Sequence, residues 1–193
     1  MRPSLKLSAL VLLLAVSTAG AKEKDKDHDE SLILMGDHRV VITVPAGYIY
    51  SSGRDDNGVL MVKVTDAKEK SVLQVAFVPD PDGLMATEKA RMDKLAVDCQ
   101  HYAEESVEKS YNFTSLAPRL GSGTFCVFAD ASLVGKEPPK DEWRNVTTGI
   151  KSWSGWCCMF TVLSNDTTSK EYQTAMRLVK DSFEELPPVS PKL

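Results

Sequence analysis

The chain has 193 residues, 42% of them hydrophobic, and a formal net charge of −4 at pH 7. This length supports one domain with a substantial core and is short for two. The acidic balance lacks the basic stripe on which nucleic-acid binding depends, so we expect no nucleic-acid partner.

The first 21 residues have the features of a cleavable export signal. Arg2 and Lys6 form a short positive region, and an apolar run of about ten residues follows from Leu7 to Val16. Ala19-Gly20-Ala21 then offers small side chains to a signal peptidase. Crossing a bilayer takes roughly 20 apolar residues. We therefore predict cleavage near Ala21, export to the periplasm or the extracellular space, and no transmembrane segment in the mature chain.

The mature chain divides into three parts. Loss of Arg2 and Lys6 with the signal changes the formal net charge from −4 to −6. Residues 22–30 contain no apolar side chain, so we expect a charged flexible leader. Residues 31–186 are predicted to form a single α+β domain, and residues 187–193 a loose C-terminal tail.

The first half of the domain is predicted to consist of strands joined by turns. Asn57-Gly58 is a strong hairpin signal, because both residues tolerate positive φ. Tyr48 and Tyr50 fall in a loop or a second short strand. The β-branched and apolar segments predicted as strands are Ser31–Met35, Arg39–Val44, Leu60–Val64 and Val72–Val78.

The second half adds two helices and at least two strands. An apolar stripe with helical spacing predicts a helix over Leu84–Lys109. Thr124–Ala129 and Gly155–Leu163 are apolar at successive positions, which indicates strands buried on both faces, and Thr147–Trp153 leads into the second. A capping box that begins at Thr168 opens a terminal helix with apolar positions from Tyr172 to Leu186.

These elements define the predicted fold class. The order is βββαββα, with an antiparallel sheet of about five to six strands and helices packed on it. Val44-Pro45-Ala46-Gly47-Tyr48 resembles the entry motif of PsbP-like domains, and Val179-Lys180-Asp181-Ser182-Phe183 resembles their closing helix. The resemblance implies an antiparallel sheet between helices and a binding or accessory role, without shared catalytic residues.

Four cysteines in an exported chain are disulfide candidates: Cys99, Cys126, Cys157 and Cys158. A Cys157–Cys158 bond is disfavoured, because adjacent residues of a strand point to opposite faces. Two full pairings remain, Cys99–Cys157 with Cys126–Cys158 or Cys99–Cys158 with Cys126–Cys157. One bridge with two free thiols is a further alternative.

The sequence contains no recognisable catalytic or metal-binding motif. It has no Gly-x-Ser-x-Gly element and no glycine-rich phosphate loop. His38 and His101 are interpreted as surface imidazoles. Cys99 and His101 would point away from each other on a helix, and Cys157-Cys158 lacks the spacing of a zinc ligand pair. We therefore predict no catalytic residues, no metal and no cofactor.

Aromatic residues are the best candidates for recognition. We expect Trp143, Trp153, Tyr48 and Tyr50 to form a binding surface, and Trp156 to belong to the core. The glycosylation sequons begin at Asn112, Asn145 and Asn165 and would be used only in a eukaryotic source.

The functional hypothesis is an exported, non-enzymatic accessory or binding protein with an unknown protein or small-molecule ligand. The alternative is a thiol–disulfide active protein that uses Cys157 or Cys158.

Overall fold

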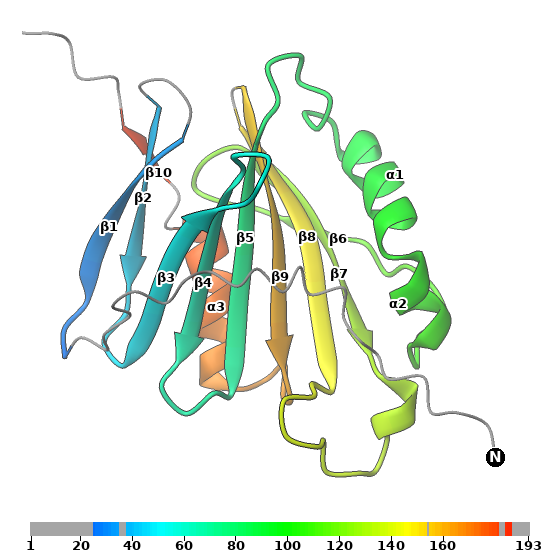
Figure 1. Cartoon of the computed structure of the whole chain (residues 1–193). Coiled ribbons are helices and arrows are strands. Elements are labelled where there is room, and N and C mark those ends of the chain that lie inside the picture. The colour runs from blue at the N-terminus through cyan, green and yellow to red at the C-terminus, as the bar shows by residue number, and fades with distance from the viewer. Residues whose placement is uncertain (1–24, 35–37, 154, 182–183, 187–193) are drawn as a thin grey trace, which may run out of the picture.

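Strands rich in β-branched and aromatic residues build most of the molecule (Figure 1). The computed structural model describes residues 25–34, 38–153, 155–181 and 184–186. A smaller sheet contains β1 (His28–Ile33), β2 (Arg39–Val44) and β10 (Glu184–Leu186). The main sheet contains β3 (Tyr48–Arg54), β4 (Leu60–Asp66), β5 (Ser71–Pro79), β6 (Thr114–Leu116), β7 (Ser122–Ala129), β8 (Asn145–Trp153) and β9 (Trp156–Ser164). The helices are α1 (Glu88–Asp98), α2 (Gln100–Glu105) and α3 (Lys170–Asp181), with a 3₁₀ turn at Ala131–Leu133.

The predicted α+β class is confirmed, but the predicted strand number and order are wrong. The described residues form ten strands, in the order five strands, α1, α2, four strands, α3 and one strand. The main sheet has the order β3-β4-β5-β9-β8-β7-β6, and the small sheet has the order β1-β2-β10. Every pairing is antiparallel. The strands beyond the predicted number are β3 and β8, which are full strands, and β6 and β10, which have only three residues each.

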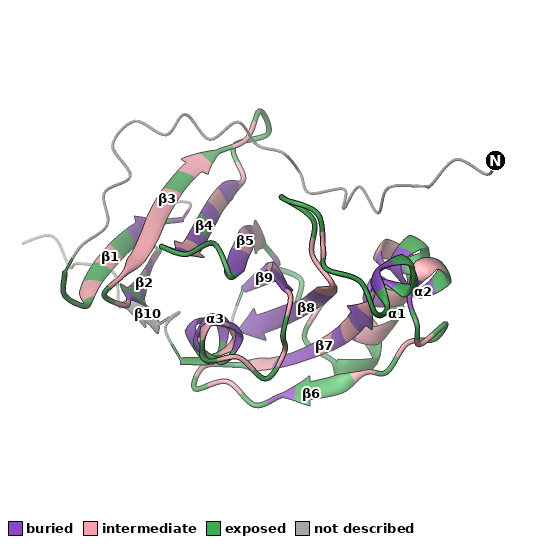
Figure 2. Ribbon diagram, turned by 90° about the horizontal axis from the view of Figure 1, so that it is seen from below, coloured by how far each residue is buried: buried purple, intermediate pink, exposed green. Residues whose placement is uncertain are grey.

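Helices cover the two faces of the main sheet over different strands (Figure 2). Helices α1 and α2 cover one face over β7 and β8, whereas α3 packs on β5 and β9 from the other side and also contacts β2. The central strand β9 is buried along most of both faces, as predicted. In β7 only the face beneath α1 is fully buried, because Phe125 and Val127 on the opposite face are half-buried.

The end of the predicted leader belongs to a strand. Residues 28–30 belong to β1, which pairs with β2 from His28 to Ile33. An edge strand needs backbone partners more than apolar side chains. Polar side chains here bind β2 and the turn after it: the Thr43 hydroxyl donates to the Asp29 carboxylate over 2.7 Å, and the backbone N–H of Ala46 donates to Asp27 over 2.8 Å. The predicted signal segment (residues 1–21), residues 22–24 and the predicted tail (187–193) lie outside the described residues.

The predicted first helix is two shorter helices. Thr87 caps α1 by accepting the N–H of Ala90 over 3.2 Å, so the helix starts later than Leu84. Cys99 has non-helical dihedrals (φ −107°, ψ 13°) and separates α1 from α2. The chain is no longer helical from Ser106, which forms a β-bridge with Asp130.

The terminal helix is also shorter than predicted. Helix α3 ends at Asp181, and Glu184–Leu186 pairs with β2 instead of continuing the helix. The end of α3 is anchored by the buried Lys151, whose Nζ donates to the carbonyl of Val179 over 3.1 Å. A cation at this position complements the helix dipole. At the start of α3 the Ser169 hydroxyl accepts the N–H of Tyr172, one position later than the predicted cap.

In the part of the chain that the structure describes, no helix has both the length and the apolar character needed to cross a bilayer.

Candidate functional site

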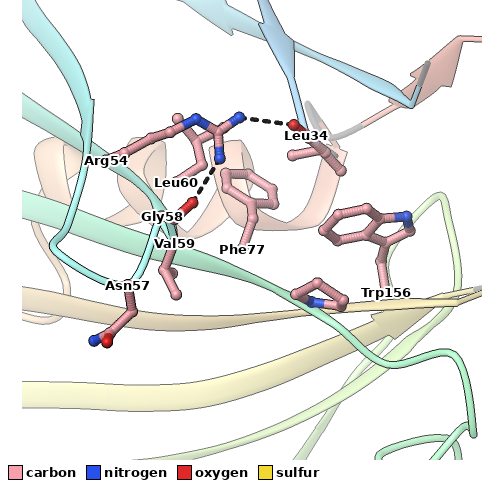
Figure 3. Close-up of a pocket in the computed structure, with 9 residues that line it drawn as sticks. Leu34, Arg54, Asn57, Gly58, Val59, Leu60, Phe77 and Trp156 are labelled. Carbon is pink, nitrogen blue, oxygen red and sulfur yellow. Dashed lines mark hydrogen bonds between the residues drawn. The ribbon is translucent and has the colours of Figure 1, made fainter. Parts of the chain in front are cut away.

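A cavity of about 160 Å³ lies at one end of the main sheet, facing the small sheet (Figure 3). Most of its lining is apolar, and one arginine lies at its rim. The lining residues are Leu34, Arg54, Asn57, Gly58, Val59, Leu60, Phe77, Pro79 and Trp156.

The antiparallel register brings these residues together from four strands. The end of β3 pairs with the start of β4, since Arg54 lies opposite Leu60. Leu60 in turn lies opposite Phe77 near the end of β5. Pro79 lies opposite Trp156, the first residue of β9. The cavity therefore lies at one end of strands β3, β4, β5 and β9, and Leu34 reaches it from the chain that follows β1.

The β3–β4 turn forms one wall. The Asp55 carboxylate accepts the N–H groups of Asn57 and Val59 over 2.9 and 2.8 Å, which fixes the loop. Gly58 has φ +79°, a conformation that most other residues adopt only with strain. The predicted Asn57-Gly58 hairpin turn is confirmed.

Arg54 joins the hairpin to the small sheet. Its guanidinium donates to the carbonyl of Gly58 over 2.6 Å and to those of Ile33 and Leu34 over 2.8 and 2.7 Å. With three carbonyl partners, the guanidinium has a structural role. Arg54 therefore holds the rim of the cavity in place.

Aromatic rings form the floor of the cavity and extend beyond it. Trp156 is only 5% exposed, and its ring meets that of His38 edge-on at 5.7 Å between centroids. Phe77 makes a similar contact with Trp153 at 6.3 Å. These contacts hold the two cavity-lining rings in fixed orientations, which favours a preformed site.

The four aromatic residues predicted to form a binding surface do not lie together. Trp153 is buried in the core on the α3 face, whereas Trp143 packs against the core on the α1 face. Tyr48 and Tyr50 are half-buried on β3 against the α3-side core, and burial raises the pKa of both phenols. None of the four lines the cavity. Trp156, interpreted as core, does line it while remaining buried.

The sheet separates the cysteines. Cys99, Cys126 and Cys157 belong to the core beneath α1, while Cys158 belongs to the core beneath α3. All four are buried free thiols. Both predicted full pairings would join Cys158 to Cys99 or Cys126, which requires a bond through the sheet. Those two pairings are therefore wrong.

Cys157 is also remote from Cys126, although the two share a face. Cys126 lies opposite Thr148, and Thr148 lies opposite Thr161, four residues beyond Cys157. With about 4.8 Å between strands and about 3.3 Å per residue, the two cysteines are about 16 Å apart. A disulfide needs Cα atoms within about 7 Å.

Burial also makes the thiols poor nucleophiles. Desolvation raises the pKa of Cys99 and Cys158 to about 12, and that of Cys126 and Cys157 to about 11. The reactive species is the thiolate. The arrangement therefore does not favour the predicted alternative, thiol–disulfide chemistry at Cys157 or Cys158.

The sequons occupy different environments. Asn112 is exposed in the chain before β6. Asn145 begins β8, and its amide nitrogen donates to the Ser164 carbonyl over 3.4 Å. The side-chain oxygen of Asn165 accepts the N–H of Arg144 over 2.8 Å. Glycosylation stays a prediction, and Asn112 is the position that best fits it.

Sequence reasoning missed the residues that define the cavity. Arg54 is the exposed last residue of β3, and nothing local indicates that it binds carbonyls about 20 positions earlier. Phe77 and Val59 are apolar residues of a kind found in any core, so their types do not mark a cavity. The available signal was the Asn57-Gly58 turn, which places the β3–β4 hairpin.

Comparison of the chain with protein-family models and with curated proteins finds no match.

Replacing Arg54 tests its role as a clamp. We expect Arg54→Met to lower the free energy of unfolding by about 1–2 kcal/mol, because three carbonyls lose a charged donor. Amide hydrogen exchange should accelerate in β1 and β2. Lys63→Met, an exposed cation-to-apolar change on β4, is the control. Equal amide hydrogen exchange in β1 and β2 of both variants would show that Arg54 does not hold the small sheet.

The raised thiol pKa values make a separate prediction about the reduced, folded protein. At pH 8 a thiol with a pKa near 11 has a thiolate fraction at least ~100-fold below that of an ordinary cysteine. Iodoacetamide should therefore modify the native protein at least about 100-fold more slowly than the denatured protein. Reactivity should rise only as the pH approaches 11. A native thiol that reacts at the denatured rate at pH 8 would contradict this result.

Proposed function

We propose that the chain is an exported binding protein that holds one apolar side chain of a partner protein in the cavity between Arg54, Phe77 and Trp156. The observation that carries this proposal is the cavity itself: about 160 Å³, mostly apolar, and framed by a fixed hairpin. An enclosed apolar cavity of roughly 150 Å³ accommodates benzene, and this cavity, which is open at its rim, has a similar volume. Pockets for drug-sized ligands are usually about 300–1,000 Å³. A single aromatic or aliphatic side chain fits best.

The chemistry of the rim supports binding. Arg54 already donates to three carbonyls, so its role is to hold the rim of the cavity in place. The apolar walls from Leu34, Phe77 and Trp156 offer contact area to a non-polar group. Aromatic anchors in such pockets supply much of the energy of protein recognition.

Export is the second part of the proposal. It rests on the positive, apolar and small-residue segments before Lys22. The resemblance to PsbP-like domains, many of which are accessory proteins, agrees with a binding role. The buried, high-pKa thiols favour this reading over thiol chemistry as the primary function.

The proposal is tested by titrating the protein with toluene and p-cresol, which mimic the side chains of Phe and Tyr. We expect saturable NMR shifts centred on the Trp156 indole N–H, with a Kd on the order of 1 mM. Val59→Phe should fill the cavity and weaken binding at least about tenfold.

Val97→Phe provides the matched control, because Val97 lies on α1, far from the cavity, and is 74% exposed. This variant should bind both probes like the unmodified protein. Shifts that never saturate, or that persist in Val59→Phe, would show that the cavity is not a binding site.

A further inference from the structure

Two contacts fix how α1 and α2 lie on β7. The Nε of Arg91 in α1 donates to the Thr124 hydroxyl over 3.2 Å. The ring of Tyr102 in α2 stacks on Phe128 with 5.9 Å between centroids. Thr124 and Phe128 point to the same face of β7, because they are four residues apart on one strand.

Cys99 and Cys126 lie between these two contacts. Cys99 falls between Arg91 and Tyr102 along the helices, and Cys126 falls midway between Thr124 and Phe128 along the strand. Both belong to the same core and are 2% and 0% exposed. Cα atoms of α1 come within 8 Å of those of β7. Cys99 also lies at the joint between two helices, outside regular helical geometry.

We propose that Cys99 and Cys126 form an intramolecular disulfide that ties the α1–α2 joint to β7, leaving Cys157 and Cys158 as thiols. The inference rests on the export half of the proposed function, which places the chain in an oxidising compartment. Cys126 is the cysteine of β7 that points to the face covered by α1 and α2, and it shares that core with Cys99. The sheet itself keeps Cys158 on the opposite face.

The oxidant is a disulfide donor of the glutathione or protein-dithiol class. The thiolate of one cysteine attacks a donor sulfur, forms a mixed disulfide and releases one donor thiolate. The second cysteine thiolate then attacks the protein sulfur of the mixed disulfide and releases the other donor thiolate. The two protons from the cysteines end on the two donor thiols, so one disulfide is reduced as one is formed.

Burial determines when this exchange happens. In the folded, reduced protein the raised pKa of both thiols suppresses the thiolate, and the helix excludes the donor. The bond therefore forms while α1 and α2 dock on β7, in open states that bring the two thiols together and still admit the donor. Once formed, it is protected from reductants in solution.

Peptide mapping tests the bond directly. The full chain is refolded from denaturant in a mixture of oxidised and reduced glutathione, its remaining thiols are alkylated in denaturant, and it is digested with trypsin without reduction. Cleavage after lysine and arginine places Cys99 on residues 95–109, Cys126 on 120–136, and Cys157 with Cys158 on 152–170. We expect one linked pair, 95–109 with 120–136, and two alkylated cysteines on 152–170. A link to 152–170, a Cys157–Cys158 bond or four alkylated thiols would overturn the proposal.

Two variants separate the bond from general stability. Reduction should lower the unfolding midpoint of the unmodified protein by about 7–14 °C, as expected for a loop of this length. Cys126→Ser should lose that redox dependence, whereas Cys157→Ser should keep it. An unchanged redox dependence in Cys126→Ser would refute the pairing.

Because the bond is assayed by refolding, its result is independent of export and of the cavity. A protein that forms the bond but binds neither toluene nor p-cresol would contradict only the binding role. A protein that binds both probes but gives four alkylated thiols would contradict only the disulfide.

Discussion

The main sheet is apolar on both faces along its central strands, and the rest of the structure depends on covering those two faces. Strand β5 buries its first three residues and then every second one. Strand β9 buries successive residues at both of its ends. Such a sheet is stable only when each face is removed from water. Helices α1 and α2 cover one side, and α3 with the small sheet covers the other (Figures 1 and 2).

The two covers differ, and the cavity lies where the second one ends. The small sheet adds apolar side chains such as Val40 and Ile42 to the core on this side, and the chain after β1 meets the end of β3 through the carbonyls of Ile33 and Leu34. Arg54 binds these two carbonyls and also the Gly58 carbonyl of its own hairpin. Beneath this joint Phe77 and Trp156 are left with unfilled space beside them. The cavity is thus a consequence of how the chain after β1 meets the end of β3 beside the shared apolar core.

Local chemistry explains what the sequence predicted well. The β-branched run Arg39–Val44, the Asn57-Gly58 turn and the apolar stripe through Leu95 each depend on neighbours within a few positions. Alternation also correctly placed Cys157 and Cys158 on opposite faces. Strand β10 could not be predicted, because three residues give no period and their partner, β2, lies about 140 positions earlier.

The site depended on contacts that the sequence does not specify locally. Which cysteine shares a face with Cys99 is decided by the face on which α1 docks. Trp143 and Trp153 are near in sequence but belong to cores on opposite sides of the sheet. Arg54 has a structural role only because the chain after β1 returns to the β3–β4 hairpin. Each of these facts is a property of the tertiary arrangement.

The central claim is that a preformed apolar cavity exists between Phe77 and Trp156. The most direct measurement is a crystal structure of the protein under xenon pressure, since apolar cavities of this size take up xenon. The account predicts xenon density beside both rings, with the Arg54 hydrogen bonds to Ile33, Leu34 and Gly58 intact. A cavity filled by neighbouring side chains, with no xenon bound there, would contradict it.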